Sequence, residues 1–210
     1  MPEAAAAMQF STPDDREEIA RAEVYGLFAS LYHAAPMHDL YEQLRVAVTE
    51  APSADAFLET SWSGLVAASR RLSLREVGDE YTALFGGVGK PEIFLYGSWF
   101  IAGTLNEKPL VDLRDALAAL GLERPLDVLE TEDHIASLCE VMRYLIAGDD
   151  LAVSNLAAQQ RFFNAHLRPW VERLCETIVA HPKADFYRAL AEFTRDFFAV
   201  ETQGLDLLDA

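Results

Sequence analysis

Apolar residues recur at intervals of three and four along nearly the whole chain, and this spacing restricts the fold more than any other feature. Such spacing places apolar side chains on one face of an α-helix. The strongest example ends at Gly148 and contains Ile135, Leu138, Cys139, Met142, Leu145 and Ile146. No alternating apolar and polar run and no Asn-Gly pair indicates a strand or a hairpin. The sequence therefore predicts an all-α fold of about eight to ten helices.

Capping residues predict where several helices begin. The predicted starts are Thr12 followed by Pro13, Ser53, Pro109, Thr131 and Asp150. Serine, threonine and aspartate accept hydrogen bonds from the first free N–H groups of a helix, and proline fits its first position. Gly121 is expected to end the helix that Pro109 opens.

The helical pattern stops at a glycine-rich segment. Three glycines and a proline within residues 86–91 disfavour a regular helix, so residues 86–108 are predicted to form an extended, mostly irregular connector. It carries Phe94, Tyr96, Trp99 and Phe100, and connectors of this length are usually functional. Because 210 residues fit a single domain, we predict one all-helical domain over residues 1–210 with a long connector at 86–108.

Charge excludes some partners. The chain has 17 Lys+Arg against 34 Asp+Glu, a net charge of −17. Duplex DNA and anionic membranes would be repelled, whereas a cationic partner would be attracted. We predict no nucleic-acid partner.

Cysteine usage and the absence of long apolar runs indicate the compartment. Cys139 and Cys175 lack C-x-x-C spacing and are predicted to be small core residues. Neither an export signal nor the roughly 18 consecutive apolar residues of a membrane span occurs. We predict a cytoplasmic protein without a membrane span.

The sequence contains no complete motif for phosphate binding or for metal binding. A phosphate-binding loop that includes Gly89-Lys90 would need glycine where Leu84 stands and a hydroxyl where Pro91 stands. The five histidines and two cysteines show no zinc spacing. We predict no metal, no cofactor, no catalytic residue and no enzymatic activity.

One acidic segment stands out. Residues 125–150 contain seven acidic residues and only one basic residue, Arg143. Glu132 and Asp133 would complement a helix dipole. On a helical wheel His134 lies about 40° from Leu138, at the shoulder of the apolar stripe. From spacing alone it is more often a histidine bonded to a backbone carbonyl than a functional one.

Three segments resemble the TorD/DmsD/NarJ family of molybdoenzyme-specific chaperones. The most specific is Glu130-Thr131-Glu132-Asp133-His134-Ile135, which is similar to the family's E-x-x-D-H-hydrophobic signature. Upstream are Tyr81-x-x-Leu84-Phe85, Pro91 and Tyr96-x-Ser98-x-Phe100; downstream are Gln160-x-Phe162-Phe163-x-x-His166-Leu167-x-x-Trp170 and Phe186-Tyr187. The resemblance spans about residues 20–200 in the family's order.

The resemblance implies an all-helical cytoplasmic chaperone. Its expected partners are the twin-arginine signal peptide and the apo-form of a molybdenum-cofactor oxidoreductase, whose export it delays until the cofactor is loaded. Two arginines beside an apolar stretch call for a groove with an apolar floor and an acidic rim. The signal-peptide-binding positions implied by the family are Tyr96, Ser98, Asp133 and His134, with Tyr81, Pro91 and Trp99 as weaker candidates. Tyr96 and Phe100 stand where relatives have tryptophan and tyrosine.

Two other functions remain as alternatives. Some relatives are linked to guanine nucleotides, which suggests a nucleotide-binding or hydrolysing enzyme. An all-α transcriptional regulator would need a basic recognition helix, and Arg70-Arg71 is the only adjacent basic pair. The resemblance also implies a domain-swapped homodimer, for which the connector at 86–108 would be the hinge.

Overall fold

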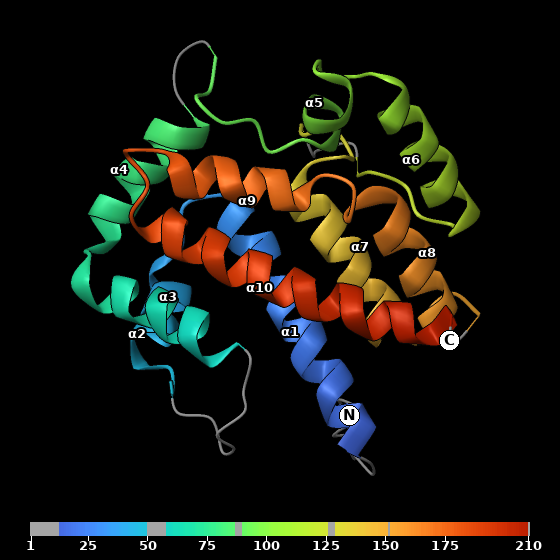
Figure 1. Ribbon diagram of the computed structural model, residues 1–210, viewed down its shortest axis with the longest axis horizontal. Coiled ribbons are helices and arrows are strands. Elements are labelled where there is room, and N and C mark those ends of the chain that lie inside the picture. The colour runs from blue at the N-terminus through green and yellow to red at the C-terminus, as the bar shows by residue number, and fades with distance from the viewer. Residues whose placement is uncertain (1–12, 50–57, 87–89, 126–128, 151, 210) are drawn as a thin grey trace, which may run out of the picture.

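The computed structural model describes residues 13–49, 58–86, 90–125, 129–150 and 152–209. This part of the chain is built from helices, and its β-structure is limited to one isolated bridge (Figure 1). The helices are α1 (Pro13–His33), α2 (His38–Val46), α3 (Glu59–Arg71), α4 (Leu74–Phe85), α5 (Gly97–Ala102), α6 (Lys108–Ala119), α7 (Ile135–Ala147), α8 (Leu156–His166), α9 (Val171–Ala180) and α10 (Phe186–Asp206), followed by a 3-10 turn, Leu207–Asp209. The predicted all-α fold is confirmed.

Helices α1, α7 and α10 form the centre of the molecule. The most extensive helix pair is α1 with α7, and α10 packs on α9 and α3. In Figure 1, α2, α3 and α4 lie on one side of this centre and α5, α6 and α8 on the other. Each central helix is long or strongly apolar, so it can bury its stripe against several neighbours.

Aromatic rings from α1 and α10 fill the core between these helices. Tyr25 meets Phe197 edge-on at a centroid distance of 5.1 Å, and Phe28 meets Phe193 and Phe197 at 5.4 Å each. Edge-to-face pairs add about 0.5–1.5 kcal/mol beyond the burial of their area. The helical spacing in α1 and α10 therefore becomes a packed interface between the two ends of the chain.

The helix boundaries partly differ from those predicted. Pro109 does lie in the first turn of α6, and Gly121, with φ of +71°, follows its end. The starts predicted at Thr131 and Asp150 are wrong, because α7 and α8 begin later, after the N-caps His134 and Asn155. The predictions at Thr12 and Ser53 fall outside the described residues.

The two displaced starts have local causes. Thr131 donates its hydroxyl to the Asp133 carboxylate at 2.6 Å and so does not cap a helix. The Asp150 carboxylate accepts from the Ala152 N–H at 3.0 Å in a local turn. Both residues form the short local bonds that compete with helix capping.

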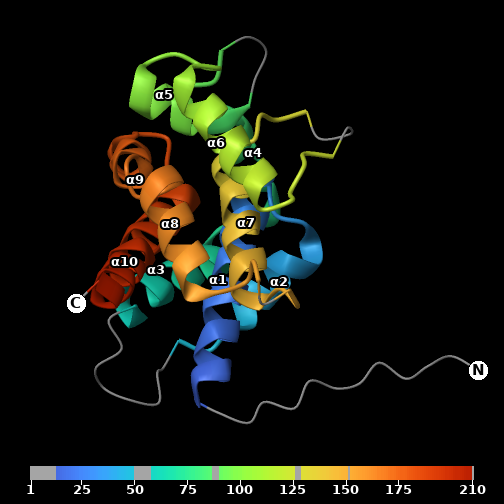
Figure 2. The same ribbon diagram turned by 90° about the vertical axis from the view of Figure 1, so that its right-hand side faces the viewer.

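The described part of the connector at 86–108 is mostly irregular, but it also contains one short helix, α5, which was not predicted. The first two N–H groups of α5, those of Gly97 and Ser98, are bonded to the main chain and the carboxylate of Asp133. Figure 2 shows α5 and the start of α6 at one end of the molecule. A partner distant in sequence therefore stabilises a helix that local spacing does not predict. Residues 87–89, which include Gly87 and Gly89, lie outside the described part.

Candidate functional site

The connector and the entry to α7 run side by side. An isolated antiparallel bridge joins Tyr96 to His134. Its two hydrogen bonds run from the Gly97 N–H to the Asp133 carbonyl and from the Ile135 N–H to the Leu95 carbonyl, both at 2.9 Å. The structure thus brings together four residues that the resemblance singles out: Tyr96, Ser98, Asp133 and His134.

Asp133 is a buried carboxylate that anchors α5. Its side chain is 3% exposed. Oδ2 accepts from the Ser98 N–H at 2.8 Å, and Oδ1 accepts from the Thr131 hydroxyl at 2.6 Å. Hydrogen bonds to a charged acceptor are each worth about 1.5–3 kcal/mol. Asp133 therefore holds α5 against the entry to α7.

His134 is the N-cap of α7. Its Nδ1 accepts from the Ala136 N–H at 3.2 Å, and its ring meets the Tyr96 ring edge-on at 5.0 Å. Burial lowers the pKa of His134 to about 4, although the negative charges of Glu130 and Asp133 oppose this shift. The ring is therefore neutral near pH 7, and because Nδ1 accepts, its proton lies on Nε2. The sequence pattern predicted a helix start at Thr131, about one turn too early, and therefore placed His134 inside the helix.

Ser98 and Gly97 are tightly enclosed. Ser98 is fully buried, and its hydroxyl has no hydrogen-bond partner in the structure. A Cβ at position 97 would lie 3.0 Å from Nε1 of Trp170. Any other residue at position 97 would require the buried Trp170 indole to shift by a few tenths of an ångström.

The three weaker candidates lie outside this hydrogen-bonded cluster. Tyr81 donates its hydroxyl to the His33 carbonyl at 2.6 Å, and burial raises the pKa of Tyr81 to about 12. The ring of Trp99 lies 4.3 Å from that of Phe94, with Lys90 Nζ 5.1 Å from the Trp99 ring centre. Pro91 is half-buried in the connector.

A groove of about 550 Å³ lies beside the entry to α7, between α1, α6 and α7. Its apolar lining consists of Ala29, Leu117, Leu122, Pro125, Ala136, Val141 and Tyr144. Its polar lining consists of Ser30, His33, Glu123, Arg124, Glu132, Ser137 and Glu140. Of these, the sequence analysis identified only Glu132 and Glu140, as part of the acidic segment. Ala136, Ser137, Val141 and Tyr144 lie on α7 close to these two acids. Ala29, Ser30 and His33 come from α1, which is distant in sequence, so no local pattern places them beside α7.

Glu132 forms part of the groove wall as an ion-paired carboxylate. Arg114 lies 3.0 Å from Glu132 and Arg124 lies 3.5 Å from it. Burial raises the pKa of Glu132, but the hydrogen bond from Arg114 and the charges of both arginines outweigh burial and hold it below its ordinary value. Glu132 is therefore ionised at neutral pH, with Arg114 and Arg124 as its counter-ions.

The described residues form neither a metal-binding group nor an accessible thiol. No group of three histidine, cysteine or acidic side chains in this part of the chain is arranged to hold a metal ion. Cys139 and Cys175 are buried free thiols, and burial raises the pKa of both. They are core residues, as predicted. None of the described helices has both the length and the apolar composition needed to cross a bilayer.

Comparison with known proteins identifies the family. A family model described as nitrate reductase delta subunit matches residues 51–176, more than half of the chain. The chain belongs to this family. The delta-subunit family includes the TorD and NarJ chaperones, so the resemblance seen in the E-x-x-D-H segment is confirmed.

Individual relatives of this delta-subunit family member support the family assignment. The chaperone protein TorD of Aliivibrio salmonicida is 26% identical over 203 residues, which cover 88% of this chain and 94% of that protein. TorD of Aliivibrio fischeri is 27% identical over 138 residues, 62% of this chain and 64% of that protein. A solved structure described as a redox enzyme maturation protein from Archaeoglobus fulgidus has a TM-score of 0.55 at 17% identity, covering 94% of this chain and 99% of that one. This family member is a maturation chaperone and not an enzyme.

Proposed function

We propose that this chaperone acts in the cytoplasm, where it binds the twin-arginine signal peptide of a molybdenum-cofactor oxidoreductase and assists maturation of the apo-enzyme before export. The observation that carries the proposal is the groove between α1, α6 and α7, which borders the E-x-x-D-H segment. Membership of the delta-subunit family supports it.

The groove suits a peptide that is apolar along its length and basic at one end. Leu117, Leu122 and Val141 supply apolar walls. Glu132 and Glu140 add carboxylates, which are paired with arginines in the free chain and would exchange them for the basic end of the peptide. Binding an amphipathic helix in such a groove buries its apolar face. The net charge of −17 attracts a basic peptide from a distance.

The bridge between the connector and α7 is the second part of the proposed site. We assign Tyr96, Ser98, Asp133 and His134 to signal-peptide binding, with Tyr81, Pro91 and Trp99 at its edge. His134 offers a neutral Nε2–H donor, and Tyr96 offers an aromatic ring held in place by the bridge. Asp133 lies behind them and supplies negative charge.

Titration calorimetry tests the proposal with the signal peptide of the twin-arginine oxidoreductase encoded beside this chain. We expect the parent to bind. Asp133→Asn should weaken binding about tenfold or more, because the carboxylate is desolvated. Tyr96→Ala should also weaken it, with less dependence on salt, because apolar contact is not screened. Circular dichroism of each variant checks that the helices persist. A parent protein that binds no leader overturns the proposed function.

A groove variant tests the location. Ser137 lines the groove, and Ser137→Leu should fill it and weaken leader binding about tenfold or more. Ser63 on α3 is a matched control, since it is also a half-buried helical serine and does not line the groove. Equal leader affinity for Ser137→Leu and Ser63→Leu would place the leader elsewhere.

A segment-exchanged homodimer is also part of the proposal, with the connector as its hinge. In the chain as described, Ile93 donates its N–H to the Leu84 carbonyl at 2.9 Å, and the bridge holds Tyr96 to His134. An exchanged dimer would make the same contacts between chains. Sedimentation at increasing protein concentration detects it.

A further inference from the structure

Two acidic side chains are buried in the described part of the molecule, and they differ in how their charge is compensated. Glu201 on α10 is 4% exposed and is bonded to Arg21, with Nε at 2.7 Å and Nη2 at 2.8 Å. Asp133 is 3% exposed, and within the described residues it forms no ion pair. Burying a charge is costly unless an opposite charge accompanies it. Asp133 therefore lacks the counter-ion that Glu201 has.

The nearest arginine does not fill this role. The pKa of Arg114 is raised mainly by its hydrogen bond to Glu132, and the charge of Asp133 contributes least. Its guanidinium is bonded to Glu132, with Nε at 3.1 Å and Nη2 at 3.0 Å. Within the described residues, the charge of Asp133 is therefore compensated by hydrogen bonds from Ser98 and Thr131 and not by an ion pair.

A cleft of about 160 Å³ opens beside Asp133, bounded by α5, the first turns of α6, α7 and the end of α8. Its polar lining consists of Ser98, Asp112, Asp133 and His166. Among the described residues, no lysine or arginine lines it. Both carboxylate oxygens of Asp112 accept from Lys108 Nζ at 2.6 Å, and an arginine in the cleft would compete with this lysine, whose side chain is 81% exposed. The cleft therefore combines two carboxylates with the unpartnered Ser98 hydroxyl.

The size and walls of the cleft fit one long side chain. Its volume equals that of roughly five water molecules. Ile101, Leu113 and Leu138 provide apolar contact for an aliphatic stem. A guanidinium group carries five donors in a planar fork and is less strongly hydrated than an ammonium group. Asp112, His166 and the Ser98 hydroxyl offer acceptors to such a fork.

We propose that this cleft receives the guanidinium group of an arginine side chain from the bound leader. The inference rests on the proposed function and adds to it a separate position for the basic end of the leader. Helix α6 borders both places, with Asp112 and Leu113 at the cleft and Leu117 at the groove. The apolar segment then lies in the groove and an arginine enters the cleft.

The cleft can be tested without a leader. The probe is the dipeptide N-acetyl-Arg-Arg-amide, and its control is the same dipeptide with citrulline, a neutral group of nearly the same shape, in place of both arginines. In ¹H–¹⁵N NMR at millimolar probe, we expect the Trp170 indole and the Ser98 amide signals to shift with arginine and not with citrulline. The absence of a shift with arginine, or equal shifts with both, overturns the inference.

Four variants then test the leader itself. Asp112→Asn removes an accessible carboxylate of the cleft, and Ala165→Leu fills the cleft from α8. Each should weaken leader binding about tenfold. Asp115→Asn on α6 and Ala157→Leu on α8 are the matched controls, because both residues are exposed and neither lines the cleft. The controls should bind as the parent does.

The outcomes separate the two proposals. If the parent binds the leader and all four variants bind equally well, the cleft is not the arginine site, while the proposed function stands. If the dipeptide shifts the cleft signals and the parent binds no leader, the cleft binds arginine and the proposed function fails.

Discussion

At the scale of single residues, three neighbours on one turn have three different surroundings. Glu132 lies on the groove wall beside Arg114, Asp133 faces the cleft, and His134 packs on Tyr96. His134 is the one whose charge state depends most on burial, which lowers its pKa to about 4. Protonating it would place a positive charge in the core and remove the Nδ1 acceptor that caps α7.

This residue should make the fold sensitive to mild acid. The folded-state pKa lies below the unfolded value of about 6.5, so the unfolded state binds the proton first as pH falls. The stability present above pH 6.5 should then decline toward pH 4. His134→Asn keeps an N-cap without titrating. Urea unfolding should show that the free energy of unfolding falls between pH 7 and pH 5, and that this fall is about 2 kcal/mol smaller in the variant than in the parent. Equal losses in both proteins would contradict the assignment.

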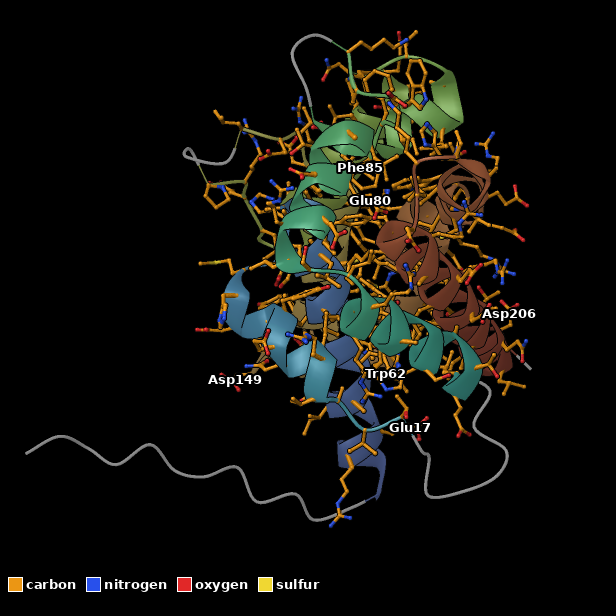
Figure 3. All side chains as sticks on the ribbon, turned by 90° about the vertical axis from the view of Figure 1, so that its left-hand side faces the viewer. Glu17, Trp62, Glu80, Phe85, Asp149 and Asp206 are labelled. Atoms are coloured by element: carbon orange, nitrogen blue, oxygen red, sulfur yellow. The ribbon has the colours of Figure 1, made fainter. Side chains whose placement is uncertain are left out.

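At the scale of elements, α10 depends on a cap supplied by another helix. Glu80 of α4 accepts from the N–H groups of Asp185, Phe186 and Tyr187 at 2.8, 3.0 and 2.8 Å (Figure 3). The N-cap residue Asp185 does not cap the helix itself, because its carboxylate is bonded to Arg71. A carboxylate at a helix N-terminus satisfies free donors and complements the dipole.

Glu80→Gln tests this inter-helix cap. The amide leaves one oxygen where the carboxylate has two, so the variant should lower the free energy of unfolding by about 1–3 kcal/mol. Asp79→Asn is the control, since Asp79 is an exposed acid on the same helix. Urea unfolding measures both. Two variants as stable as the parent would show that the cap contributes little.

At the scale of the whole molecule, one buried network joins helices from the two ends of the chain. Arg21 of α1 contacts both oxygens of Glu201 on α10 and, at 3.2 Å, the side-chain oxygen of Gln159 on α8. The hydroxyl of Tyr25 donates to Glu201 at 2.9 Å. The network therefore orients α1, α8 and α10 around the aromatic core.

Removing Arg21 should be costly, because Glu201 would remain buried without a counter-ion. Arg21→Leu is expected to lower the free energy of unfolding by about 3–5 kcal/mol. The double variant Arg21→Leu with Glu201→Leu should recover much of this loss. Arg45→Leu, in an exposed pair with Glu42, should change stability by about 1 kcal/mol or less. An Arg21→Leu protein as stable as Arg45→Leu in thermal unfolding would contradict this view.

The sequence by itself determined the family and most of the helices, although not α5. Helical spacing is a local property, so the stripes of α1, α7 and α10 predict those helices without knowledge of their neighbours. The E-x-x-D-H segment is contiguous and identifies the family in the same way. Pro109 and Gly121 mark the limits of α6 because they act through their own backbone.

The tertiary structure decided everything that depends on residues distant in sequence. Helix α5 begins where Asp133 bonds to Ser98. Helix α7 begins at Ile135, after its N-cap His134, and the Thr131 hydroxyl is bonded to Asp133 and does not cap it. The groove and the cleft join side chains from three and four helices, whose approach no local pattern encodes. Asp133 and His134 become buried only when the helices pack, because desolvation is a property of the folded surroundings. The neutral state of His134 at pH 7 is therefore decided by the tertiary structure.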